Sequence, residues 1–119
     1  TLLAQSDVIS LHCPLTEQTR HLIAQDEFST MKPSAIIINT ARGGIIHESD
    51  LLNALKTGEI AAAGIDCLAT EPPAANDPMI TANLPQLIIT PHNAWGSVQA
   101  RQRLVDGTAQ NIDNFLKLS

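Results

Sequence analysis

The sequence has no cluster of basic residues and no long apolar segment, and each absence excludes a class of protein. Lys and Arg number 7 against 12 Asp and Glu, which gives a formal net charge of −5. A chain of this charge does not suit the phosphate backbone of nucleic acids, so we expect no nucleic-acid partner. No apolar run approaches the roughly 20 residues that span a bilayer, and no signal peptide is recognised at the start. We therefore expect no membrane partner.

Cysteine is also scarce. The chain has only two, Cys13 and Cys67, which lie far apart in the sequence and form no CxxC pair. This spacing indicates neither a disulfide framework nor a zinc site. We expect two reduced thiols in a cytoplasmic protein and no metal site, with a disulfide between the two cysteines as the alternative.

What the chain does contain is enough apolar sequence for one domain. Of its 119 residues, 44% are hydrophobic and 16% are charged, which is typical of a globular protein with a core. Four short, continuously apolar runs alternate with helical or loop segments, at 8–11, 35–38, 61–65 and 87–89. Such runs predict strands covered on both faces. The predicted fold class is α/β, a partial Rossmann-type, doubly wound parallel sheet of about four strands with flanking helices.

Helical periodicity predicts three connecting or terminal helices, at 25–31, 48–57 and 97–118. Gly58 stands where a glycine commonly ends a helix. The segment 69–84 is rich in Pro, Ala and Asn, so we expect a long loop or a short irregular helix there. Long loops in compact domains are often functional.

The predicted strands are all followed by residues suited to binding. In order, these are His12 and Cys13, then Asn39, Thr40, Ala41 and Arg42, then Asp66, and finally Thr90 and His92. In open parallel sheets, ligands bind outside the carboxyl ends of the strands, which meet at one edge. The alternative is that polar residues mark the exit of any strand from a core, and that His12 bonds to backbone. Four such strand ends favour a site.

Arg42 is the most informative of these residues, because its five N–H donors at a sheet edge suit a carboxylate or phosphate. Gly43 and Gly44 lack Cβ atoms, so the backbone behind Arg42 can approach another group closely. Glu71, in the loop after the third strand, is a solvated carboxylate or a partner for His92. A carboxylate beside an imidazole fixes its tautomer and suits it to proton exchange near neutral pH.

The combination of segments resembles a known family. SDVISLHCPLTEQTRHLI (6–23), MKPSAIIINTARGGII (31–46), GEIAAAGIDCLATEPP (58–73) and LIITPHNAW (87–95) resemble the NAD-binding domain of the D-isomer-specific 2-hydroxyacid dehydrogenases. The segments cover most of the chain in the family's order and spacing. The form PHNAW, with Trp95, is most similar to the bacterial glycerate dehydrogenase (hydroxypyruvate reductase) branch.

The resemblance implies hydride transfer between NAD(H) and C2 of a D-2-hydroxy acid or 2-oxo acid, here D-glycerate and hydroxypyruvate or glyoxylate. It implies that Arg42 binds the substrate carboxylate, that His92 is the acid/base and that Glu71 is its paired carboxylate. Asp66 matches a position near the nicotinamide carboxamide. The implied cofactor-binding residues are Cys13, Thr40, Ala41, Arg42, Asp66, His92 and Trp95. NAD is the expected cofactor, and NADP is not excluded.

The family's glycine-rich GxGxxG turn does not occur in this sequence. Residues 1–12 have the pattern of a helix end running straight into a strand. We therefore expect 1–119 to be the C-terminal portion of the NAD-binding domain, a fragment of a larger two-domain protein whose GxGxxG half and substrate domain lie elsewhere. Alone, it should be inactive. By resemblance, the full-length protein is expected to be a homodimer.

Three alternatives remain open at the level of the sequence. The first is another enzyme of the same family, such as a phosphoglycerate, lactate, formate or phosphonate dehydrogenase. The second is an NAD-sensing binding module such as a transcriptional corepressor, which can retain the same three residues. The third is a structural domain with a vestigial site.

Overall fold

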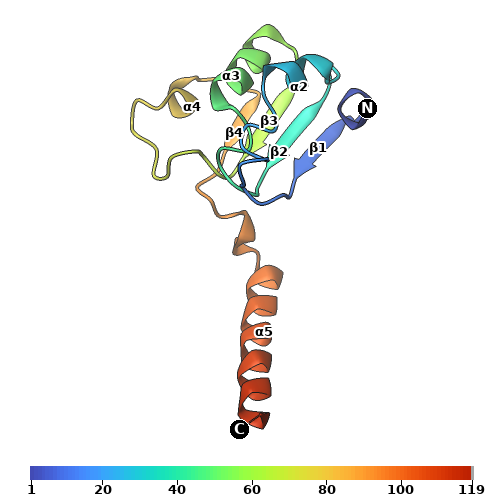
Figure 1. Ribbon diagram of the computed structural model, residues 1–119. Helices are drawn as coiled ribbons and strands as arrows, with labels where there is room; N and C mark the ends of the chain where they lie inside the picture. The colour runs from blue at the N-terminus through green and yellow to red at the C-terminus, as the bar shows by residue number, and fades with distance from the viewer. Residues whose placement is uncertain (119) are drawn as a thin grey trace.

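The computed structural model describes residues 1–118, which form a small α/β body and one long helix that extends away from it (Figure 1). The elements in chain order are α1 (Leu2–Gln5), β1 (Val8–Leu11), α2 (Gln25–Thr30), β2 (Ile36–Asn39), α3 (Glu48–Thr57), β3 (Ala62–Ile65), α4 (Pro78–Thr81), β4 (Leu87–Ile89), the 3₁₀ helix η1 (Ala94–Gly96) and α5 (Val98–Lys117). The predicted strands and helices are confirmed, with boundaries that shift by a residue or so. The predicted loop 69–84 contains the short helix α4.

The four strands form one parallel sheet in the order β1-β2-β3-β4. Every connection therefore steps in the same direction across the sheet. Because such connections are right-handed, they place their helices on the same face. This arrangement confirms the α/β, Rossmann-like fold and brings all four carboxyl ends to one edge.

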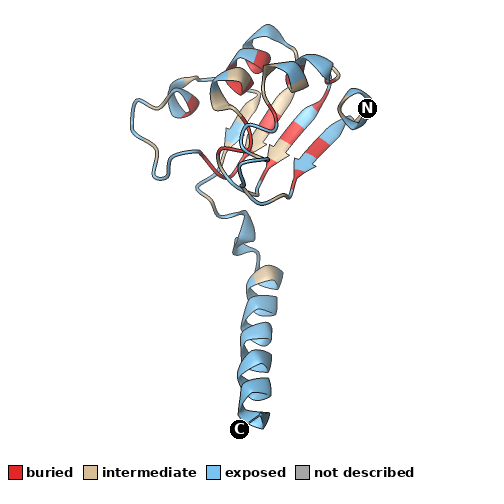
Figure 2. Cartoon of the chain, in the orientation of Figure 1, coloured by how far each residue is buried: buried red, intermediate tan, exposed pale blue. Residues whose placement is uncertain are grey.

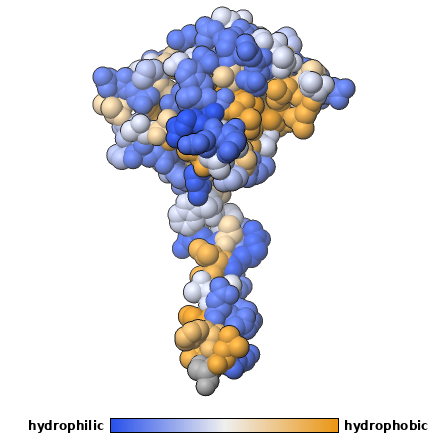
Figure 3. Space-filling view, viewed as in Figure 1, coloured by the Kyte–Doolittle hydropathy of each residue, from blue (hydrophilic) through white to orange (hydrophobic). Residues whose placement is uncertain are grey.

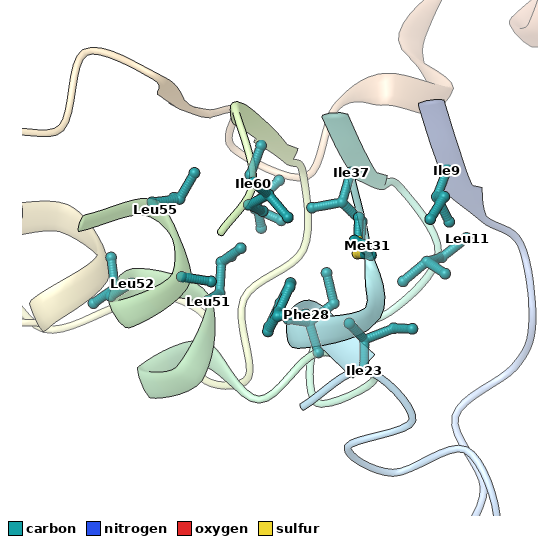
Figure 4. Close-up of a cluster of buried hydrophobic side chains, with 14 of the residues drawn as sticks. Ile9, Leu11, Ile23, Phe28, Met31, Ile37, Leu51, Leu52, Leu55 and Ile60 are labelled. Atoms are coloured by element: carbon teal, nitrogen blue, oxygen red, sulfur yellow. The ribbon is translucent and has the colours of Figure 1, made fainter. Parts of the chain in front are cut away.

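The core lies between the sheet and the helices α2 and α3 (Figure 4). Phe28 of α2, Leu51 of α3 and Ile37 of β2 are fully buried there. Burial of each such side chain contributes roughly 1.5–3 kcal/mol. Helix α3 buries its predicted apolar stripe and ends at Gly58, whose φ of 75° is left-handed. That conformation favours glycine, as the sequence indicated.

The opposite face of the sheet is exposed within the described residues (Figure 2). Val8, Ile36 and Ile88 point to this side and are exposed, Ile88 by 66%. The apolar runs predicted strands covered on both faces, and residues 1–118 cover one. The physical reason is the strand order, because a sheet built in one direction receives its connecting helices on one side only. Hydrophobic surface is visible on the side of the body where β1 and β2 lie (Figure 3).

Helix α5 is capped at its start by Ser97, whose hydroxyl accepts a hydrogen bond from the backbone N–H of Ala100 at 3.2 Å. The helix carries apolar residues such as Val105 and Ile112, but these are exposed, and none of residues 98–117 is buried. The helix extends from η1 with both apolar and polar side chains exposed (Figure 3). No helix in the described part of the chain is long and apolar enough to cross a membrane.

Candidate active site

The carboxyl ends of the four strands meet at one edge, because neighbouring strands pair in parallel. Pairing continues just past the strands, where the backbone N–H of Asp66 donates to the Asn39 carbonyl at 2.9 Å. In the same way, the N–H of Thr90 donates to the Ile65 carbonyl at 3.0 Å. The segments that carry Arg42, Asp66 and His92 are thus registered against each other. The structure brings the predicted strand-end residues to a common edge.

Glu71 and His92 form the clearest chemical pair at this edge. Glu71 Oε2 lies 2.7 Å from His92 Nδ1, and Glu71 Oε1 accepts a hydrogen bond from the Leu68 backbone N–H at 2.9 Å. These two hydrogen bonds, the one with His92 first, hold the pKa of Glu71 below its ordinary value of 4.5. The side chains are 36% and 40% exposed, so the pair is fixed in position and still accessible.

Asp66 holds the turn on which His92 sits. His92 has a φ of 51°, a left-handed conformation uncommon for a residue with a side chain. The buried Asp66 carboxylate accepts hydrogen bonds from the Thr90 hydroxyl and from the backbone N–H groups of Asn93 and Ala94, the last two at 2.9 Å. Burial raises the pKa of Asp66, but these hydrogen bonds outweigh it and hold the pKa below the ordinary 3.8.

Sequence reasoning assigned Asp66 to the cofactor and did not identify this anchoring of the His92 turn. A detectable signal was present: an aspartate that ends one strand and a threonine that follows the neighbouring strand lie at the same level of a parallel sheet. Trp95 adds a further contact, because its indole N–H donates to the His92 carbonyl at 3.0 Å while its ring remains exposed.

Asn39 holds the turn that carries Arg42, as Asp66 holds the turn that carries His92. Its buried side chain donates from Nδ2 to the Arg42 carbonyl at 2.8 Å and accepts from the Ala41 N–H at 3.0 Å. Such side-chain bonds to the following backbone are typical of asparagine in turns, so the pattern was available in the sequence. The Arg42 guanidinium is exposed and donates from Nη1 to the Ala41 carbonyl at 2.6 Å. Thr40 lies exposed beside them.

Gly43 makes a close backbone approach, as expected, but to the protein itself. A Cβ on Gly43 would stand 1.9 Å from the carbonyl oxygen of Leu68. Gly44 instead has a φ of 80°, which suits the turn. The first glycine thus joins the Arg42 turn to the segment that leads to Glu71.

Two cavities open near this edge. One, of about 580 Å³, is lined by His12, Cys13, Pro14, Leu15, Ala41 and Arg42. The other, of about 600 Å³, is lined by Leu68, Glu71, Pro72, Pro73, Ile80, Ile89, Thr90, Pro91 and His92. Of the predicted site residues, Cys13, Ala41 and Arg42 line the first cavity and form an Arg42 group, while Glu71 and His92 line the second and form a His92 group. Thr40, Asp66 and Trp95 line neither of these two cavities. Among the described residues, the His12 ring bonds to a side chain rather than to backbone: its Nε2 lies 2.9 Å from the Ser10 hydroxyl.

Cys67 follows Asp66 and lies buried behind the Glu71–His92 pair, and both cysteines of the chain are free thiols. Burial raises the pKa of the Cys67 thiol, and the Asp66 and Glu71 carboxylates raise it further. The sulfur, a carboxylate oxygen of Glu71 and a ring nitrogen of His92 all lie within 4.8 Å of one another. The sequence spacing gave no indication of this grouping, because the fold creates it.

The fold and the edge site define a Rossmann-like nucleotide-binding domain. Residues 1–94 match the family described as D-isomer specific 2-hydroxyacid dehydrogenase, NAD binding domain, and the chain belongs to this family. The resemblance noted in the sequence is thereby confirmed.

Among related proteins, a glycerate dehydrogenase of Methylorubrum extorquens is 50% identical over 116 residues, which are 98% of this chain and 37% of that protein. A hydroxypyruvate reductase of Blautia hydrogenotrophica is 44% identical over 116 residues, or 98% of this chain and 35% of that protein. The chain thus spans little more than a third of the length of these relatives.

Solved structures also match nearly all of this chain and little more than a third of their own length. An acyclic imino acid reductase in complex with NADPH and D-Arg superposes with a TM-score of 0.84 at 36% identity, over 98% of this chain and 36% of that one. A D-isomer specific 2-hydroxyacid dehydrogenase of Lactobacillus delbrueckii ssp. bulgaricus, in its NAD complex, gives 0.82 at 31% identity, over 97% of this chain and 38% of that one.

Proposed function

We propose that the protein carrying this chain is an NAD(H)-dependent oxidoreductase of D-2-hydroxy acids. It transfers hydride between the nicotinamide and C2 of D-glycerate and hydroxypyruvate, or glyoxylate. The observation that carries the proposal is the Glu71–His92 pair at 2.7 Å, at the carboxyl edge of the sheet, where open parallel sheets bind their ligands. The names of the relatives from Methylorubrum and Blautia support the choice of substrate.

His92 is the proposed acid/base. Because its Nδ1 faces Glu71, its Nε2 is the nitrogen left to give a proton to the C2 oxygen in reduction and to take it back in oxidation. Glu71 fixes the ring's tautomer and orientation and stabilises its protonated form. Asp66 supports the same ring indirectly, by holding the turn on both sides of His92.

Arg42 is the proposed site for the substrate carboxylate. One guanidinium nitrogen is engaged by the Ala41 carbonyl, which leaves the remaining N–H donors of an exposed side chain for a ligand. A planar donor fork suits two carboxylate oxygens at once and helps to polarise the neighbouring C2 oxygen.

The residues at this edge fit part of a dinucleotide. The cavity of about 580 Å³ beside Cys13 and Ala41 has the size and concave shape typical of a cofactor site. When bound, the nicotinamide supplies or accepts the hydride. The residues proposed to hold the cofactor are Cys13, Thr40, Ala41, Arg42, Asp66, His92 and Trp95. NAD is the proposed cofactor, and NADP is the alternative. A comparison of NADH and NADPH oxidation distinguishes them.

We also propose that 1–119 is the C-terminal portion of the NAD-binding domain. The uncovered sheet face, the unburied α5 and the 37% share of the Methylorubrum relative support this assignment. A cytoplasmic homodimer without nucleic-acid or membrane partners is the proposed form of the full-length protein. The two free thiols suit a reducing compartment, and the net charge of −5 argues against a nucleic-acid partner.

The test is steady-state kinetics on the full-length protein that carries this chain. NADH or NADPH oxidation is followed with hydroxypyruvate, glyoxylate, pyruvate and 3-phosphohydroxypyruvate, and the values of kcat/KM are ranked. We expect NADH with hydroxypyruvate or glyoxylate to rank first, and the 119-residue chain alone to show no turnover. Failure of every 2-oxo acid to oxidise either cofactor would overturn the proposal.

A further inference from the structure

We propose that Cys67, Glu71 and His92 form a binding site for a soft divalent cation, such as Zn²⁺ or Cd²⁺, that inhibits the enzyme when bound. The observation is their juxtaposition: one ligand atom from each residue lies within 4.8 Å of the other two. The three residues come from the end of β3, the loop after it and the turn after β4. The binding site itself does not depend on the proposed function, whereas the inhibition does.

The ligand types determine which cation fits. Thiolate, imidazole and carboxylate are the ligands that Zn²⁺ takes in proteins, at about 2.0–2.3 Å, which places tetrahedral ligand atoms roughly 3.3–3.8 Å apart. Glu71 and His92 are already close, at 2.7 Å between Oε2 and Nδ1. Small side-chain movements can therefore bring the three ligand atoms to coordination distance around one ion. The sulfur favours Zn²⁺ and Cd²⁺ over Mg²⁺ and Ca²⁺, which prefer oxygen ligands.

The local charge also favours a cation. The carboxylates of Asp66 and Glu71 lie close enough to Cys67 to oppose a bare thiolate, while the Arg42 guanidinium acts in the opposite sense. A divalent cation interacts favourably with all three anionic groups at once. Asp66 contributes through its field, because its oxygens already accept hydrogen bonds from the His92 turn.

An entry path exists on one side. Cys67 is buried and offers its sulfur from the interior, whereas Glu71 and His92 are partly exposed and line the cavity of about 600 Å³. A cation can therefore enter from the cavity and keep water or solvent ligands on that side, as an incomplete protein ligand set requires.

Coordination would conflict with the proposed role of His92. A ring with one nitrogen bound to a cation cannot cycle between imidazole and imidazolium, and the ion also displaces the hydrogen bond to Glu71. Bound cation and proton transfer are thus mutually exclusive at this pair. The expected behaviour is reversible inhibition that a chelator relieves.

The direct test is a Cd²⁺ titration of the full-length protein, followed by the ultraviolet charge-transfer absorption of a cadmium–thiolate bond. We expect a band that saturates at one Cd²⁺ per chain in the wild type and in Cys13→Ser, which removes the other cysteine of residues 1–119. Any cysteine that the full-length protein carries outside these residues is replaced by serine in every variant. The band should be absent in Cys67→Val and in Cys67→Ser, the second variant guarding against a packing defect in the first. Glu71→Gln should weaken binding at least tenfold. A band that survives in Cys67→Ser, or unchanged affinity in Glu71→Gln, would overturn the site.

The functional test uses Zn²⁺ inhibition of 2-oxo acid reduction. Cys67→Ser should keep the basal rate and need at least tenfold more Zn²⁺ for half-inhibition, while Glu59→Gln, a change at a carboxylate that is hydrogen-bonded to Gln25, should match the wild type. Equal inhibition of Cys67→Ser and the wild type would overturn the inhibitory role. If the protein reduces no 2-oxo acid, the cadmium absorption still decides the binding site, so the two proposals fail separately.

Discussion

Gly43 and Leu68 approach so closely that a Cβ on Gly43 would stand 1.9 Å from the Leu68 carbonyl oxygen and 2.6 Å from the next backbone nitrogen. Both are backbone atoms, so neither can rotate aside. This contact ties the turn that carries Arg42 to the segment that carries Cys67 and Glu71. The Arg42 group and the His92 group can therefore lie this close only because residue 43 has no side chain.

Replacement of Gly43 by alanine should separate these segments. We expect Gly43→Ala to lower the free energy of unfolding by about 3 kcal/mol, because a backbone shift is needed to admit the methyl group. Gly107→Ala is the control, since nothing lies within 4 Å of its Cβ position. In the exposed interior of α5 it should stabilise by about 0.5–1 kcal/mol. Urea unfolding of both variants measures the difference, and equal effects would contradict the role of the contact.

His92→Asn tests the proposed acid/base. Asparagine tolerates the left-handed conformation of this residue, so the turn should persist while proton exchange is lost. We expect kcat for 2-oxo acid reduction to fall about 100- to 10,000-fold. His21→Asn is a matched control, because His21 has a nearly identical φ of 52° and lies elsewhere. A near-wild-type rate in His92→Asn would exclude the acid/base role.

Glu71→Gln tests the pairing without changing side-chain size. The glutamine no longer offers His92 Nδ1 a charged hydrogen-bond acceptor, so the ring is held less firmly and we expect kcat to fall about tenfold or more. Glu59→Gln, a carboxylate that is hydrogen-bonded to Gln25, should leave the rate unchanged. Equal rates in Glu71→Gln and the wild type would show that the carboxylate does not act through the histidine.

Arg42→Lys tests substrate binding at constant charge. A lysine cannot present two parallel N–H donors, so we expect KM for the 2-oxo acid to rise about 10- to 100-fold with a smaller loss of kcat. Arg101→Lys, on the exposed helix α5, provides the control. If KM stayed at the wild-type value in Arg42→Lys, the bidentate contact proposed for Arg42 would be wrong.

Asp66 should make stability depend on acid pH. Its folded-state pKa lies below the ordinary 3.8, so its stabilising contribution is present above that value and is lost as the pH falls through the folded-state pKa. Asp66→Asn should remove this part of the acid sensitivity and cost about 2 kcal/mol at neutral pH, because two backbone N–H groups lose a charged acceptor. Urea unfolding between about pH 3 and 7 measures both effects, with the exposed Asp113→Asn as the control. If the stability of Asp66→Asn and that of the wild type depended on pH in the same way, the proposed contribution of the Asp66 carboxylate would be wrong.

The sequence by itself determined the strands, the parallel sheet and the edge at which the site lies. Short apolar runs such as 35–38, separated by helical segments, predict strands, and parallel strands necessarily bring their carboxyl ends together. The stop of α3 at Gly58 was equally predictable, because a left-handed cap favours glycine. The family was indicated by the resemblance of four sequence segments, and the match over residues 1–94 confirmed it.

Only the tertiary structure decided which side chains hold the site in place. Asp66 meets Thr90, Asn93 and Ala94 because β3 and β4 are neighbours in register, and the residue types after these strands suggest this meeting without fixing it. Gly43 meets Leu68 because β2 and β3, which precede them, are also paired neighbours. The exposure of one sheet face was likewise not visible in the apolar runs. It depends on the one-directional strand order, which sets the side on which the connecting helices pack.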